Sequence, residues 1–226
     1  MLKAVIFDFD GVIVDSEALH LKAFNEVLAP FGLAITKKDY YKKYLGLTDA
    51  DCFREFVLKH KAVFKDTAVE TLLKKKRIAF GKLAKTEADI IDGVPEFLEM
   101  LRSNKIPMAI CSGALLGEIE LILEGAALSD YFDCIVSAEQ VKRGKPYPDG
   151  FLLALKKLNE TSRDKIAAKQ CVVIEDSHWG LEAAKAAGMH TIAVTNSYDA
   201  KQLSMAEKIV AKLSQLTMDD LQKICR

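Results

Sequence analysis

The sequence has no long uninterrupted run of hydrophobic residues. None of its apolar stretches reaches the roughly 20 residues that a membrane-spanning helix needs, and its start lacks the pattern of a signal peptide. The chain also lacks net charge, because 32 Lys and Arg residues balance 32 Asp and Glu residues. Nothing in this balance indicates attraction to nucleic acid or to an anionic membrane. We therefore expect a cytoplasmic protein that binds neither.

Cysteine is scarce, and its spacing excludes two common uses. The chain of 226 residues has five cysteines and no C-x-x-C pair, so neither a zinc site nor a disulfide framework is indicated. Three of them stand in apolar, strand-like runs. We expect reduced, buried thiols, as in a cytoplasmic protein. They are Cys52, Cys111, Cys134, Cys171 and Cys225.

Half of the residues are hydrophobic, which is enough for a substantial core in one large domain or two unequal ones. Short apolar runs alternate with helical patterns over most of the chain. This alternation predicts an α/β fold in which helices cover both faces of a parallel sheet. The predicted strands span 1–7, 107–111, 134–137, 171–174 and 191–195, and the predicted helices that follow span 96–103, 117–124, 149–158, 179–187 and 219–224.

One long segment breaks this alternation. Between residues 16 and 88 the sequence has helical patterns without a convincing strand, at 16–29, 38–44, 49–60 and 67–85, with breaks at 46–48 and around 65–66. We predict a separate helical unit at 16–88, inserted into a core made of 1–15 and 89–226. Its basic run at 74–77 is typical of a solvated face. The alternative is that one lysine of the unit points into a cleft at an anion.

Polar side chains follow three of the predicted strands. Because parallel strands present their carboxyl ends at one edge of a sheet, these side chains should converge there. Taken singly, each has an ordinary structural explanation, such as a turn, a solvated lysine or a helix N-cap. Their joint order along the chain favours a site. They are Asp8 and Asp10, then Ser112, then Lys145 in a loop, then Glu175 and Asp176.

Phosphoryl transfer is the chemistry that fits this set. A carboxylate such as Asp8 can attack phosphorus, and Asp10 can act as general acid to the leaving oxygen and later as base to water. Asp8 and Asp176 can hold Mg²⁺, provided that they lie close enough to share one ion. Lys145 can add positive charge, and Ser112 a hydrogen bond, to the transferring group.

These motifs resemble those of the haloacid dehalogenase (HAD) superfamily of hydrolases. The matches are DFDGV at 8–12, CSG at 111–113, GKPYPD at 144–149 and IEDS at 174–177, and together they span nearly the whole chain. The resemblance implies a Rossmann-like, doubly wound core and a helical cap of the C1 type that closes over the site. It also implies Mg²⁺-dependent phosphoryl transfer through an aspartyl-phosphate.

The resemblance further implies a role for each matched residue. Asp10 argues against dehalogenation, because the dehalogenase members of the superfamily lack this second acid. The implied roles are nucleophile for Asp8, acid and base for Asp10, phosphate binding for Ser112, Gly113 and Lys145, and metal binding for the Asp8 side chain, the Asp10 carbonyl and Asp176, with Glu175 in or next to that shell.

Within the superfamily the chain is most similar to the β-phosphoglucomutase-like phosphatases. His20 falls at the position of a hinge histidine in the mutase, and the loop 46–49, with Thr48 and Asp49, matches the loop that reads substrate. The mutase has an arginine where this chain has Asp49, and a carboxylate would repel the second phosphate of a bisphosphorylated sugar. For Lys76 two interpretations stand: a solvated position in the basic run, or one facing the cleft.

We expect a magnesium-dependent phosphatase of a small phosphorylated metabolite, such as a sugar phosphate. One alternative is a phosphosugar mutase, which Asp49 disfavours. Another is a catalytically inactive metabolite-binding protein, which the complete set of core acids and lysine disfavours. For the assembly state we expect a monomer or a weak homodimer.

Overall fold

The computed structural model of the protein describes residues 1–44, 47–64, 67–162 and 164–226. The chain divides into two compact units, one made of Met1–Asp15 with Asp89–Arg226 and the other of Ser16–Ala88. We refer to them as the core unit and the helical unit. The predicted breaks at Gly46 and at residues 65–66 lie outside the described residues.

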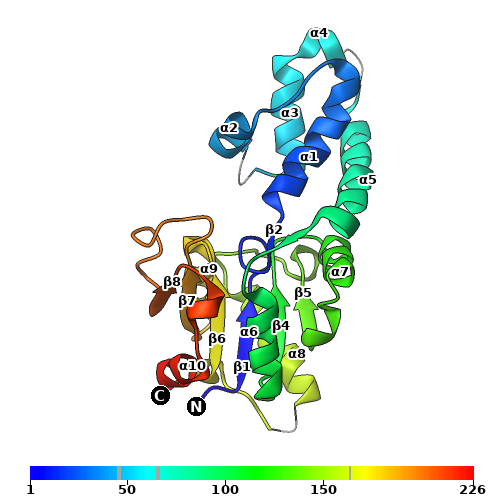
Figure 1. The fold of residues 1–226 in the computed structure, drawn as a ribbon. Coiled ribbons are helices and arrows are strands. Elements are labelled where there is room, and N and C mark those ends of the chain that lie inside the picture. Colours follow the sequence, from blue (N-terminus) through cyan, green and yellow to red (C-terminus); the bar gives the residue numbers. More distant parts are fainter. Residues whose placement is uncertain (45–46, 65–66, 163) are drawn as a thin grey trace. The chain divides into compact units, whose positions relative to one another are not determined.

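A six-stranded sheet forms the centre of the core unit, with the strand order β5-β4-β1-β6-β7-β8 (Figure 1). Every neighbouring pair in it is parallel, which confirms the predicted α/β fold. The edge strand β8 was missed, because a run of three residues is too short to show a periodicity. The strands are β1 (Ala4–Phe7), β4 (Met108–Cys111), β5 (Cys134–Val136), β6 (Cys171–Glu175), β7 (His190–Val194) and β8 (Lys208–Val210).

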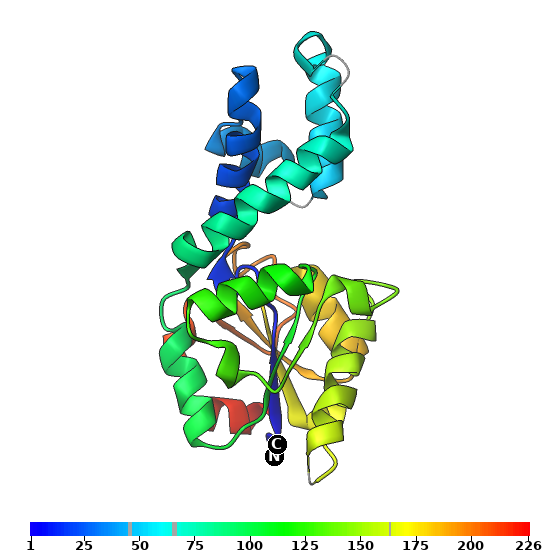
Figure 2. The same ribbon diagram turned by 90° about the vertical axis from the view of Figure 1, so that its right-hand side faces the viewer.

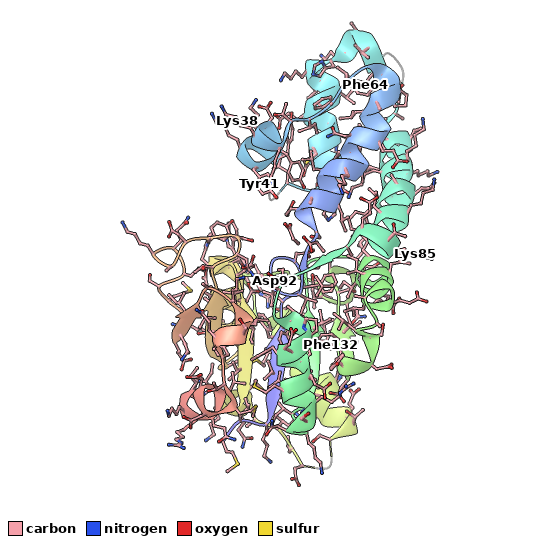
Figure 3. The ribbon with its side chains drawn as sticks, viewed as in Figure 1. Lys38, Tyr41, Phe64, Lys85, Asp92 and Phe132 are labelled. Atoms are coloured by element: carbon pink, nitrogen blue, oxygen red, sulfur yellow. The ribbon has the colours of Figure 1, made fainter. Side chains whose placement is uncertain are left out.

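Both faces of the sheet are covered, as the uniformly apolar strands require. Figure 2 shows α6 (Val94–Ser103) and α10 (Met218–Ile224) on one side of the sheet, with α8 (Asp149–Thr161) and α9 (His178–Ala186) on the other. Successive residues of a strand point to opposite faces, so Ile6 packs in the cluster that contains Phe151. Phe7 instead meets the rings of Phe97 and Phe132 edge-on, and Phe132 is labelled in Figure 3.

The remaining elements of the core unit are short. They are the helix α7 (Leu116–Gly125), the 3₁₀ turns Ser129–Tyr131, Ala138–Gln140, Ala168–Gln170 and Leu213–Gln215, and a second, two-stranded sheet of β2 (Val14–Asp15) and β3 (Asp89–Ile90). This ribbon is antiparallel and pairs Val14 with Ile90 and Asp15 with Asp89. Because residue 16 follows β2 and residue 88 precedes β3, the chain leaves for the helical unit and returns from it at the same end of the ribbon.

The helical unit has its own hydrophobic core, in which aromatic rings predominate. Phe24 contacts Phe53. Phe64, which is labelled in Figure 3, packs against Phe31 and Phe56. Its elements are α1 (Glu17–Leu28), a 3₁₀ turn (Ala29–Phe31), α2 (Lys37–Asp39), a π-helical turn (Tyr40–Tyr44), α3 (Asp49–Lys59), α4 (Lys61–Phe64) and α5 (Val69–Glu87).

None of the helices in the described residues of either unit is both long enough and apolar enough to cross a membrane.

Candidate active site

Three neighbouring strands deliver polar residues to one edge of the sheet. β1 lies between β4 and β6 and is parallel to both. Asp8 follows β1, Ser112 follows β4, and Asp176 follows β6, whose last residue is Glu175. All four side chains are buried. The carboxyl ends of the strands therefore create a polar, largely enclosed site of the kind expected in a parallel sheet.

Three carboxylates at this edge form a buried cluster. One oxygen from each of Asp8, Glu175 and Asp176 lies within 4.8 Å of the others, and the residues are 8%, 0% and 4% exposed. Burial raises the pKa of Asp8 well above its usual range, although Lys145 opposes the shift. Burial and the charge of Glu175 raise the pKa of Asp176 to about 7. Asp8 and Asp176 are close enough to share one ion.

Lys145 is the cation that meets this cluster. Its Nζ atom donates to Asp8 Oδ1 at 2.6 Å and to Glu175 Oε1 at 2.5 Å. Burial alone would lower the pKa of Lys145, but the carboxylates of Asp8 and Glu175 raise it well above its usual value. Lys145 is therefore a permanent positive charge beside Asp8.

The cluster has the donor set of a hard divalent cation. One ammonium group does not neutralise three buried carboxylates, and uncompensated buried charge is costly. Glu175 Oε2 accepts hydrogen bonds from the backbone N–H groups of Asp176 and Ser177 and from the Ser177 hydroxyl. Carboxylate oxygens of Asp8 and Asp176, with Glu175 beside them, are the ligands that Mg²⁺ prefers in proteins.

Asp10 and Ser112 contact each other next to the cluster. The Ser112 hydroxyl lies 3.3 Å from Asp10 Oδ2 and accepts a hydrogen bond from the backbone N–H of Ala114 at 2.9 Å. Asp10 is less buried than Asp8, because β1 has ended at Phe7 and the chain turns at Gly11. The two aspartates therefore do not face each other as they would on a continuous strand. Gly113, the remaining predicted phosphate-binding residue, is exposed.

Two glycines leave room for the carboxylates. A Cβ atom at Gly11, whose φ is +77°, would lie 1.9 Å from Asp176 Oδ2. A Cβ atom at Gly180 in the first turn of α9 would lie 1.8 Å from Glu175 Oε1. Neither position can accept a larger residue without displacing an acid of the cluster.

Sequence reasoning missed two residues that support the site. The Ser197 hydroxyl donates to Asp176 Oδ2, and the Asn196 side chain donates to the backbone carbonyl of Gly11 at 2.7 Å. A signal was available, because both residues closely follow β7, a parallel strand next to β6. The strand-end reasoning used for Asp8 and Asp176 would have found them.

The burial of Lys76 in the helical unit excludes one of the two interpretations drawn from the sequence. A solvated position in the basic run is wrong, because Lys76 is 1% exposed. Lys74, Lys75 and Arg77, the other members of the run, are exposed. Position 76 lies four residues after the buried Leu72 and four before the buried Phe80, so it falls on the apolar face of α5.

The other predicted residues of the helical unit lie near Lys76 or cap a helix. Lys76 Nζ is 2.6 Å from both His20 Nδ1 and Asp49 Oδ2, and the His20 ring stacks on Phe80. Burial and the charge of Lys76 lower the pKa of His20 to about 3. Thr48 caps α3 by accepting a hydrogen bond from the backbone N–H of residue 51. Gly46 of the same loop lies outside the described residues.

Comparison with known proteins gives a consistent result. A family model described as haloacid dehalogenase-like hydrolase matches residues 5–194. A phosphorylated carbohydrates phosphatase from Thermotoga maritima is 34% identical over 195 residues, which are 84% of each chain. The fructose-1-phosphate phosphatase YqaB of Escherichia coli is 31% identical over 192 residues, covering 84% of this chain and 95% of that protein.

A solved structure agrees with these relatives. The crystal structure of β-phosphoglucomutase from Clostridium difficile superposes with a TM-score of 0.77 at 25% sequence identity, covering 100% of this chain and 97% of that one. Sequence motifs, sheet order and the cluster of acids agree with the family match over most of the chain. The chain therefore belongs to the haloacid dehalogenase-like hydrolase family.

Proposed function

We propose that this protein is a magnesium-dependent phosphatase that releases inorganic phosphate from a small phosphorylated metabolite, such as a sugar phosphate. The observation that carries the proposal is the meeting of Asp8 with Lys145 and Asp176 at the carboxyl edge of the sheet. The phosphatase names of two relatives support it. The five free cysteines support a reducing compartment such as the cytoplasm.

In the proposed reaction a carboxylate oxygen of Asp8 attacks phosphorus, and the bond from phosphorus to the ester oxygen breaks. The phosphoryl group then resides on Asp8 as a mixed anhydride. Lys145, 2.6 Å from Asp8 Oδ1, offsets the repulsion between an anionic nucleophile and an anionic substrate. The Ser112 hydroxyl, held by the backbone N–H of Ala114, can turn from Asp10 to an oxygen of the phosphoryl group.

Asp10 is the proposed general acid and general base of the reaction. It gives a proton to the leaving ester oxygen, which departs as an alcohol, and then takes a proton from the water that attacks phosphorus. That second step restores the Asp8 carboxylate and the protonated Asp10. Asp10 suits both roles because it lies beside Ser112 and is less enclosed than Asp8.

The donor set would hold Mg²⁺ through the Asp8 side chain, Asp176 and the Asp10 carbonyl, with Glu175 adjacent. When bound, this ion would neutralise negative charge on the phosphate and on the acids. Glu175 orients Lys145, and Ser197 orients Asp176. These contacts keep the charged groups in place before substrate arrives.

The nucleophile can be tested with Asp8→Asn, which keeps the side-chain shape and removes the attacking carboxylate. We expect phosphate release from a panel of sugar phosphates to fall by about a thousandfold or more. The control Asp130→Asn, at an exposed position outside the site, should retain the wild-type rate. Removal of divalent cations by a chelator should abolish release, and added Mg²⁺ should restore it. An Asp8→Asn enzyme with the wild-type rate would refute the assignment.

A mutase remains the second candidate, because the fold matches a β-phosphoglucomutase structure. Phosphorus NMR of the reaction separates the two functions, since a phosphatase produces inorganic phosphate and a mutase produces an isomeric sugar phosphate. We propose the former, because Asp49 stands where a cation would be needed. We also propose that the enzyme acts as a monomer or weak homodimer, without nucleic acid or a membrane.

A further inference from the structure

The loop that follows β7 contacts the candidate site at two points, through two adjacent residues. The side-chain amide of Asn196 donates to the backbone carbonyl of Gly11 at 2.7 Å, and the Ser197 hydroxyl donates to Asp176 Oδ2. Gly11 directly follows Asp10, the proposed acid and base, whereas Asp176 is a proposed metal ligand. The same loop therefore reaches the group that transfers protons and the group that binds the metal, and all of these residues belong to the core unit.

The turn at Gly11 has a conformational freedom that its neighbours must restrict. Its φ of +77° is a value that glycine adopts without strain, and glycine adopts many others as readily. The backbone N–H of Gly11 donates to the carbonyl of Val14, which is a bond within the same short segment. The bond from Asn196 comes from a residue 185 positions away, so it ties the turn to the end of β7. Because Asp10 precedes Gly11 by one peptide bond, this tie also limits where the Asp10 carboxyl group can lie.

The position of Asp10 matters because a general acid acts only within hydrogen-bond reach of the atom that it protonates. Its Oδ2 atom lies 3.3 Å from the Ser112 hydroxyl, which is one of the proposed phosphate-binding groups. A displacement of about 1 Å can lower a rate by as much as a hundredfold. The loss depends on the ester, because a sugar alkoxide must be protonated as it leaves, whereas the stable anion of 4-nitrophenol can leave without a proton.

We propose that Asn196 is a positioning residue for the general acid: by holding the Gly11 carbonyl, it places the Asp10 carboxyl group at the leaving oxygen of an alkyl phosphate. Ser197 provides the contrast, because it contacts Asp176 and its effect should therefore be on the metal. This inference rests on the proposed function. Both side chains lie outside the four family motifs, and both residues are exposed, so their truncation leaves no cavity in the core.

The test measures kcat/KM with saturating Mg²⁺ for two esters, 4-nitrophenyl phosphate and the sugar phosphate that the wild-type enzyme hydrolyses fastest. This parameter covers the steps up to departure of the alcohol, so it reports on Asp10 as an acid and not as a base. For Asn196→Ala we expect about a tenfold loss with the sugar phosphate and less than about a twofold loss with 4-nitrophenyl phosphate. Its Mg²⁺ affinity, measured by calorimetry, should equal that of the wild type.

Ser197→Ala should give a different pattern from that of its neighbour. Without the Ser197 hydroxyl the Asp176 carboxylate is less well oriented, so we expect weaker Mg²⁺ binding in calorimetry. At a fixed, subsaturating Mg²⁺ concentration the loss of kcat/KM should be similar for the two esters, because the metal acts on the phosphate that they share. The two variants together therefore separate an effect on the acid from an effect on the metal.

Matched controls come from α6, where two adjacent residues make the same kinds of contact away from the site. The Asn104 amide donates to the carbonyl of Met100 at 2.8 Å, and the Ser103 hydroxyl donates to the Glu99 carboxylate at 3.2 Å. Asn104→Ala and Ser103→Ala should retain the wild-type values for both esters and for Mg²⁺ binding.

A second variant, Asn196→Leu, keeps a side chain of similar size without its N–H donors, so it makes the same comparison if the alanine variant fails to fold. Equal losses with the two esters, or no loss with either, in a folded variant at position 196 would overturn the inference. Absence of phosphate release from any ester by the wild-type enzyme would instead overturn the proposed function.

Discussion

At the scale of single residues, the candidate site depends on glycines, which have no side chain, as much as on the charged residues. Glu175 is fully buried and accepts hydrogen bonds from Lys145 and Ser177. It can occupy this place because Gly180, in the first turn of the next helix, has no Cβ atom. A small residue on α9 thereby controls where a carboxylate of the cluster lies.

Substitution of this glycine should therefore damage the site while leaving the fold largely intact. In Gly180→Ala the new methyl group would lie 1.8 Å from Glu175 Oε1, so the buried carboxylate would have to move away from its contacts with Lys145 and Ser177. We expect about a hundredfold loss of kcat/KM and weaker Mg²⁺ binding, measured by calorimetry. The control is Gly117→Ala in α7, where a Cβ atom would have no neighbour within 4 Å. Equal activity of both variants would contradict this account of Gly180.

His20 provides a second prediction at this scale, one that concerns stability. Its pKa is lowered to about 3 in the folded protein, whereas an unfolded histidine has a value of about 6.5. Between these values the unfolded state binds the additional proton. The contribution of His20 therefore makes the free energy of unfolding decrease as the pH falls below about 6.5, by up to about 1.4 kcal/mol per pH unit.

Urea denaturation of His20→Gln at pH 7 and pH 5 measures this effect. The variant should lose less stability on acidification than the wild type, since glutamine does not titrate. A His20→Gln variant with the wild-type slope would show that His20 is not held neutral in the folded protein.

At the scale of secondary-structure elements, the loop that precedes α3 has a structural role in its own right. Thr48 accepts a hydrogen bond from the backbone N–H of Asp51 and donates one to its carboxylate. The first of these contacts satisfies a backbone N–H group in the first turn of α3, a helix whose first residue is Asp49. The N-cap therefore determines where α3 begins and positions Asp49.

Thr48→Ala should reduce the free energy of unfolding by about 1 kcal/mol, the usual cost of losing an N-cap. Thr48→Ser should keep most of that stability, because a serine hydroxyl caps equally well. Thermal denaturation of both variants gives the comparison. If Thr48→Ala instead raised KM without changing stability, the residue would act on the substrate and not through the helix.

At the scale of the whole molecule, the two units are joined through one antiparallel ribbon. Asp15 pairs with Asp89 across β2 and β3, so the insertion of Ser16–Ala88 begins and ends at paired residues. Directly paired residues in an antiparallel ribbon have Cα atoms about 5 Å apart. A two-residue hairpin turn can span that gap.

We predict that joining Asp15 to Asp89 through an Asn-Gly dipeptide gives a folded core unit. It should unfold in one cooperative transition and bind Mg²⁺ at the site that we propose, because the acidic cluster and Lys145 belong to the core unit. It should still release phosphate from sugar phosphates, because the proposed nucleophile Asp8 and the proposed acid Asp10 belong to the core unit. Circular dichroism, calorimetry and phosphate release provide the three measurements. A shortened chain that aggregates or fails to bind the ion would contradict the prediction.

The sequence by itself determined the class of the fold and the list of core residues to consider. Apolar runs that alternate with helical patterns are local signals, and the edge of a parallel sheet is where such runs must end. The sequence alone therefore assigns Asp8, Ser112 and Asp176 to one edge of the sheet. The family motifs depend on the same short stretches.

Only the tertiary structure decided which distant residues touch. Lys76 is buried among Phe24 and Phe80, which are distant from it in the sequence or a full turn away on its helix. Ser197 contacts Asp176 from the end of another strand. Gly180, on the helix that follows β6, leaves the space that Glu175 occupies. A basic run in a sequence has the same composition whether one of its lysines points to water or into a core. Such outcomes depend on how helices pack and where counter-ions lie, and no local pattern contains that information.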